Sequence, residues 1–193
     1  MIKHFSSAAL LLALALTATT ASAHTGAHDI DGFISGLSHP FLSLDHLLVM
    51  LGVGLWASRL TPLNAGFTIA AFLSFMVCGA GLALSGLTIQ GVETGILASV
   101  LIVGLLLSVS RRLPSLLVIG LLAGFAVLHG FAHGLEMPLA AAPVDYAVGF
   151  LLATASLHGI GLGLGAMLSY HRFGLRMSGY ITSGLGLYLL FNA

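Results

Sequence analysis

The sequence carries very little charge. Only 6% of its 193 residues are Asp, Glu, Lys or Arg, whereas 58% are apolar and the mean hydropathy is +1.09. A soluble domain has charged side chains at about a quarter of its positions. This chain has too few to cover a surface that faces water, so we expect it to fold in a lipid bilayer.

Other absences exclude further classes of protein. The net charge is zero and no basic run is present, so a nucleic-acid-binding surface is not expected. No phosphate-binding P-loop motif occurs, which argues against direct use of ATP. The one cysteine, Cys78, excludes an intramolecular disulfide, and its apolar surroundings predict a packing role.

The first residues have the pattern of a secretory signal peptide. Lys3 supplies the positive charge, residues 8–16 form the apolar region, and Ala21-Ser22-Ala23 is a cleavage site of the A-x-A type. We expect residues 1–23 to be removed, leaving a single membrane domain of residues 24–193 that begins with His24. The alternative is an uncleaved first helix, which would leave the orientation of the chain unchanged.

Six apolar segments follow the leader, each close to the length of about 20 residues that a membrane-spanning helix requires. The fold class expected is therefore all-α, a polytopic membrane protein with six transmembrane helices after a cleaved signal peptide. The segments are residues 39–57, 64–87, 92–109, 115–135, 145–168 and 174–192.

Basic residues predict the orientation of these segments. After the leader the chain has no lysine, and all five arginines follow the first, third or fifth segment. The positive-inside rule then places both termini on the outer, periplasmic side of a bacterial inner membrane. The arginines are Arg59, Arg111, Arg112, Arg172 and Arg176.

Histidine is unusually frequent, with nine residues against six Lys and Arg together. Histidine is costly in hydrocarbon and tends to mark functional sites there. His39 and His46 would lie about 20° apart on one continuous helix that has Pro40 in its first turn. Asp45 could orient a histidine ligand or bind a metal itself. The alternative is a structural Asp–His pair that joins two helices.

A second group comprises His129, His133 and Glu136, which share one helix face at spacings of four and three residues. Two imidazoles and a carboxylate in this arrangement can bind one metal ion, although paired interface histidines with a solvated acid are the alternative. The predicted topology places both groups in the outer half of the membrane. Such ligands suit Ni²⁺, Co²⁺, Zn²⁺ or Cu²⁺ better than Mg²⁺ or Ca²⁺.

Three more histidines could take part. His158 lies deeper, near the middle of the fifth segment, as a ligand or a proton acceptor; a hydrogen bond between packed helices is the alternative. At the mature N-terminus, the free amino group and His24 could chelate an ion with His28 nearby. A disordered tail is the alternative for that segment.

The residues 39–46 (HPFLSLDH), 52–57 (GVGLWA) and 129–136 (HGFAHGLE) resemble the HupE/UreJ family, and the similarity extends over essentially the whole chain. The resemblance implies a secondary transporter of nickel, or of cobalt in some members, and not an enzyme. The expected partners are the transported divalent ion and the lipid bilayer, with no prosthetic group. The oligomeric state is left open, and a homo-oligomer is one possibility.

Two positions depart from the family pattern. Phe131 stands where the family often has a further histidine, and Ser43 stands where it often has glycine. Phe131 should point away from the face shared by His129 and His133. Two other functions stay open for such a chain: an intramembrane zinc-dependent hydrolase, and a metal-binding partner subunit that does not transport.

Overall fold

The computed structural model describes residues 32–109, 115–138, 141–171 and 173–192. The predicted signal peptide, its cleavage site, His24 and His28 lie outside the described residues, as do Arg111, Arg112 and Arg172. The described residues form helices and no strands, which confirms the all-α class. The helices are α2 (Gly32–Leu42), α3 (Leu44–Ala57), α4 (Pro62–Leu84), α5 (Val92–Ser108), α6 (Ser115–Glu136), α7 (Pro143–Ser169) and α8 (Gly174–Asn192).

Each of the six predicted segments corresponds to a helix, except that the first is broken. α2 and α3 meet at Ser43 at an angle of 81°. The prediction of one continuous helix from residue 39 to residue 57 is therefore wrong, and so is the placement of Pro40 in a first turn. Pro40 lies near the end of α2, and Ser43 has the extended backbone that separates the two helices.

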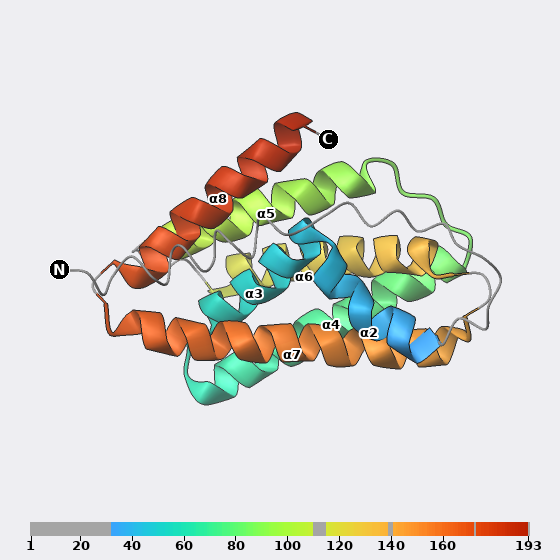
Figure 1. The fold of residues 1–193 in the computed structure, drawn as a ribbon, viewed down its shortest axis with the longest axis horizontal. Coiled ribbons are helices and arrows are strands. Elements are labelled where there is room, and N and C mark those ends of the chain that lie inside the picture. The colour runs from blue at the N-terminus through green and yellow to red at the C-terminus, as the bar shows by residue number, and fades with distance from the viewer. Residues whose placement is uncertain (1–31, 110–114, 139–140, 172, 193) are drawn as a thin grey trace.

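The helices run back and forth along the long axis of the molecule (Figure 1). The closest partners are α4 with α6, α5 with α8, and α2 and α3 with α7. Among the described helices, α4, α6 and α7 are long and apolar enough to cross a membrane, and α2 with α3 would be a fourth span if counted together. α5 is apolar but has only 17 residues. Six crossings therefore stay a prediction.

Glycines allow the closest of these helix pairs to form. A Cβ atom on Gly54 of α3 would overlap the carbonyl oxygen of His158 in α7, and one on Gly130 of α6 would overlap that of Met76 in α4. Small residues of this kind let backbones approach in a bilayer, where packing rather than water exclusion holds helices together. Cys78, in contrast, is exposed on α4, so the packing role expected for it is wrong.

Arginine side chains gather at one end of the bundle. The α3–α4 and α7–α8 connections lie at the same end (Figure 1), and they are adjacent to Arg59 and Arg176. Arg59 donates hydrogen bonds to the carbonyl oxygens of Leu106, Leu107 and Val109, where α5 ends. Carbonyls at a helix C-terminus lack partners within the helix and favour a positive charge. Burial, with a contribution from the nearby Arg176, lowers the pKa of Arg59.

Candidate metal centre

The break between α2 and α3 brings His39 and His46 together across a bend. His39 lies in the last turn of α2 and His46 in the first turn of α3. Their ring centroids are 6.2 Å apart. The sequence correctly grouped these two residues, but the contact arises from two helices rather than from one helix face.

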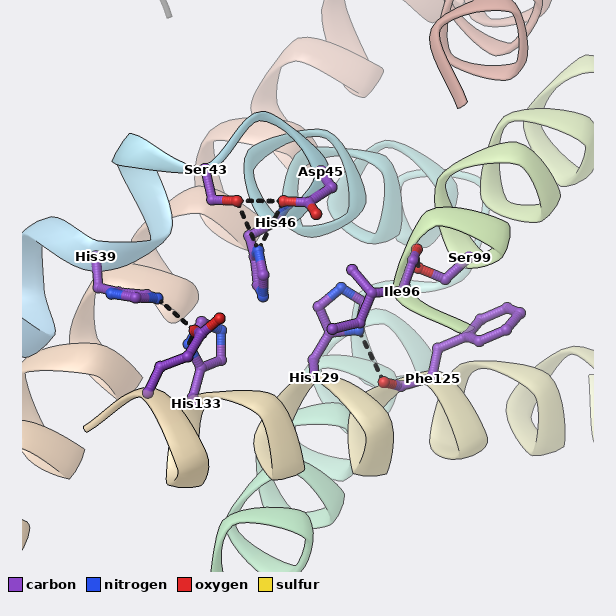
Figure 2. A network of polar contacts seen from close by, with 10 residues as sticks. His39, Ser43, Asp45, His46, Ile96, Ser99, Phe125, His129 and His133 are labelled. Atoms are coloured by element: carbon purple, nitrogen blue, oxygen red, sulfur yellow. Dashed lines mark hydrogen bonds and ion pairs between the residues drawn. The ribbon is translucent and has the colours of Figure 1, made fainter. Parts of the chain in front are cut away.

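α6 contributes the opposing side chains from its last two turns. His129 and His133 rise from this helix toward His39 and His46 (Figure 2). The centroid distances are 4.3 Å for His46–His133, 4.7 Å for His39–His133 and 5.0 Å for His46–His129. Four imidazoles that are distant in sequence thus form one cluster, which we call the histidine cluster.

Glu136 adds a carboxylate at the rim of the histidine cluster. Its Oε2 atom accepts a hydrogen bond from His39 Nε2 at 2.9 Å and lies 3.6 Å from His133 Nδ1. Ligand atoms of His39, His133 and Glu136 all lie within 4.8 Å of one another. Two nitrogens bound to one ion are at most about 4.2 Å apart, since each metal–nitrogen bond is about 2.1 Å. A small inward movement would therefore let these three groups share an ion.

The cluster becomes more buried from its rim inward. The side chains of His39 and Glu136 are 28% and 40% exposed, whereas that of His133 is only 2% exposed. His46 and His129 are also buried. An ion entering from the rim would meet partly exposed ligands first and buried ligands behind them.

Asp45 holds His46 in a fixed orientation. The Oδ1 atom of Asp45 lies 2.7 Å from His46 Nδ1 and also accepts the backbone N–H of His46 at 2.7 Å. The hydroxyl of Ser43 donates to the same carboxylate and lies 3.0 Å from His46 Nδ1. Because a carboxylate only accepts, the ring proton resides on Nδ1 and the Nε2 atom keeps a free lone pair. Asp45 therefore orients a histidine, one of the two roles that the sequence left open.

Backbone carbonyls orient two further histidines in the same way. His129 Nδ1 donates to the carbonyl oxygen of Phe125 at 2.8 Å, and His158 Nδ1 donates to that of Thr154 at 2.7 Å. Both residues are completely buried. Their Nε2 atoms therefore present lone pairs to the interior, which is the form of imidazole that binds metal.

Several of the buried ring nitrogens have no hydrogen-bond partner within the described part of the chain. The buried nitrogens without a hydrogen bond are Nε2 of His46, His129 and His158 and both ring nitrogens of His133, whose Nδ1 approaches Glu136 only to 3.6 Å. A buried polar group without a hydrogen bond costs about 1–3 kcal/mol, and unpaired groups in a native interior call for a ligand, ion or water. A divalent cation fits this set of donors.

His158 lies farther than the histidine cluster from the end of the bundle where α6 ends and α7 begins. It is the 16th residue of α7, about 22 Å from the start of that helix at 1.5 Å per residue. His129 lies about 10 Å from the end of α6 by the same measure, and the two helix ends are joined by a short connection. The Phe72 ring of α4 contacts both histidines, with centroid distances of 5.1 Å to His158 and 6.4 Å to His129.

The structure thus brings together the predicted residues His39, Asp45, His46, His129, His133 and Glu136. Phe131 is buried in an apolar group with Val92, Ile96 and Ala132, and the direction expected for its side chain stays a prediction. Sequence reasoning missed the parts played by Ser43 and Phe72. Ser43 could have been noticed, because it is two residues from Asp45 and replaces a glycine; Phe72 carries no such signal in an apolar run.

Comparisons with known proteins place the chain in a family. Residues 12–189 match the family model described as HupE / UreJ protein. Protein HupE from Rhizobium leguminosarum bv. viciae is 39% identical to this chain over 164 residues, which cover 85% of this chain and 83% of that protein. No solved structure shows a significant match. The chain belongs to the HupE/UreJ family.

Proposed function

We propose that this protein is a secondary transporter that takes up a divalent transition metal ion across the bacterial inner membrane. Nickel is the first candidate and cobalt the next, as the family resemblance implies, while zinc and copper also suit imidazole and carboxylate ligands. The ion would cross the membrane through a bundle of six transmembrane helices. Both termini of the chain would lie on the periplasmic side. His24 and His28 would gather the ion in front of the histidine cluster.

The observation that carries this proposal is the set of unpaired, oriented imidazole nitrogens in the cluster. A buried structural pair would use both ring nitrogens in hydrogen bonds. Here Asp45 and the Phe125 carbonyl each occupy one nitrogen and leave the other free. Broken helices are common at the binding sites of secondary transporters, and the break at Ser43 supplies two of the ligands.

An ion would move from the rim toward the arginine-rich end. It would meet His39 and Glu136 first, lose water to His46, His129 and His133, and then pass to His158. Asp45 and Glu136 offset its charge. Metal binding requires imidazoles without a proton on the ligating nitrogen, so the proton on His39 Nε2 must leave before that atom binds. This coupling makes proton exchange a suitable driving force.

The experiment that tests the proposal measures uptake of labelled Ni²⁺ and Co²⁺ into proteoliposomes that contain the purified protein. The His133→Ala variant removes a buried ligand and should show no saturable uptake. His171→Ala is the matched control, because it is the same substitution in the connection between α7 and α8, far from the cluster. We expect that control to transport like the unchanged protein.

The same samples distinguish the alternatives. Binding of metal without flux would contradict the transporter and favour a partner subunit. Stoichiometric zinc retained through purification, together with hydrolysis of a lipid or peptide substrate, would favour an intramembrane hydrolase, which needs a fixed metal that activates water. Saturable uptake that depends on His133 excludes both as the main function.

A further inference from the structure

Phe72 occupies an unusual place in the bundle. It is only 1% exposed and lies on α4, which contributes no histidine to the cluster. Its ring contacts His129, at the inner limit of the histidine cluster, and His158, the next histidine toward the arginine-rich end. The Nε2 atoms of both histidines are buried and accept no hydrogen bond from any residue that the structure describes.

An aromatic ring in contact with two such ligands has a physical consequence. A divalent ion needs polar ligands or water at every step, and a phenyl ring provides neither. Apolar constrictions can close a pathway by excluding water from it. The Phe72 ring therefore places an apolar side chain against both histidines at the step where the ion would leave the histidine cluster for His158.

The packing beside the ring is incomplete. A cavity of about 10 Å³ lies on the α4–α6 side of the bundle and is lined by Phe72, Thr68, Phe75 and Leu122, among others. A tightly filled interior would hold the ring in one rotamer, because cores pack as densely as organic crystals. This void has room for about one water molecule, so it loosens the packing on that side of the ring, and displacement of the ring would also need neighbouring side chains to shift.

We propose that Phe72 is the barrier that separates the histidine cluster from an inner station at His158. The inference rests on the proposed transport function, because a barrier matters only in a protein that moves an ion. Its test does not require transport. With the ring in place, the histidine cluster communicates with the outer side only. Displacement of the ring toward α6 opens the way to His158.

Accessibility of residue 158 to a membrane-impermeant thiol reagent tests the barrier directly. Cys78→Ser gives a protein without cysteine, and His158→Cys then supplies a single reporter, which is labelled from outside in spheroplasts. We expect slow labelling with Phe72 present. Phe72→Ala should speed the labelling by about tenfold, as expected if an open state rises from roughly 1% to 10% of the molecules.

Three controls accompany this measurement. Phe67→Ala makes the same change at an exposed position of α4 and should leave the rate unchanged. His39→Cys, at the rim, should react rapidly whether or not Phe72 is present. Phe72→Leu fills most of the space of the ring and should give an intermediate rate, which covers the case in which the alanine variant does not fold.

The outcomes separate the two proposals. The barrier proposal would be overturned if residue 158 in the His158→Cys protein were labelled at the same rate with Phe72 present and in the Phe72→Ala and Phe72→Leu variants. Slow labelling of the His39→Cys protein would overturn the outward orientation of the cluster and the barrier with it. Labelling does not require transport, so protection by Phe72 in a protein without nickel flux would support the barrier and contradict the proposed function.

Discussion

At the scale of single residues, the role of Asp45 can be separated from direct metal binding. Asp45→Ala removes the acceptor that holds His46 Nδ1. Loss of a group that orients a ligand typically weakens metal binding by about 10–100-fold, and we expect a loss of that size for Ni²⁺, measured by isothermal titration calorimetry on the purified protein.

Asp45→Asn is the informative companion. The amide oxygen can still accept the Nδ1 proton of His46, so this variant should recover part of the affinity. Equal loss in the alanine and asparagine variants would instead mean that the carboxylate acts through its charge or as a ligand. Ser43→Ala removes the hydroxyl that donates to Asp45 and should have a smaller effect than either.

Phe131 gives a prediction about metal choice. A histidine at this position would restore a residue that the family often has, yet the site is completely buried in an apolar group with Val92 and Ile96. We expect Phe131→His to lower the free energy of unfolding by about 1–3 kcal/mol, the cost of an unsatisfied buried polar group. The ratio of Ni²⁺ to Co²⁺ uptake should stay the same; a changed ratio would show that residue 131 reaches the ion.

At the scale of elements, the crossing of α3 and α7 depends on glycine. Gly54→Ala would place a methyl group against the His158 carbonyl and the Cα atom of Gly161. Overpacking of this kind costs about 1–3 kcal/mol, so the variant should unfold at a lower temperature in detergent and transport less, because His158 is displaced.

Gly159→Ala is the matched control for that substitution. No described atom lies within 4 Å of a Cβ atom at Gly159, and alanine favours a helix over glycine by about 1 kcal/mol. We therefore expect equal or higher stability in this variant. A loss of stability as large as that of Gly54→Ala would mean that glycine flexibility, rather than the close crossing, matters in both helices.

The sequence predicted α4 to α8 well because apolar runs and breaks at Pro, Gly and Arg mark their limits. It did not predict α2, since residues 32–38 contain two glycines and two serines and form no long apolar run. Contacts with α7 supply the stability that this segment lacks by itself. The break at Ser43 was equally hidden, because the apolar pattern continues on both sides of it.

In the metal centre too, the sequence predicted what one helix determines and did not predict what depends on packing between helices. His129, His133 and Glu136 could be grouped from their spacing, since a single helix fixes their relative positions. The meeting of α6 with the α2–α3 bend was expected only as a shared depth in the membrane. The contact of Phe72 with His129 and His158 depends on how three helices pack, and no local pattern in the sequence records that packing.

At the scale of the whole molecule, the orientation of the chain is the prediction with the widest consequence. The α3–α4 and α7–α8 connections, which are adjacent to Arg59 and Arg176, lie at one end of the bundle, and α6, whose last residue is Glu136, ends toward the other (Figure 1). Basic residues favour the cytoplasmic side. Alkaline phosphatase, which is active only outside the cytoplasm, should therefore be active when fused after Ala193 and inactive when fused after Arg59.

A series of such fusions also counts the crossings. With six spans, fusions after Gln90 and Met137 are active, as they follow an even number of spans, while a fusion after Tyr170 is inactive. If α5 and α8 did not cross, the fusion after Met137 would follow three spans and be inactive, and the fusion after Tyr170 would follow four and be active. Activity after Arg59 would reverse the whole arrangement, place Glu136 and His39 in the cytoplasm, and turn the proposed uptake into export.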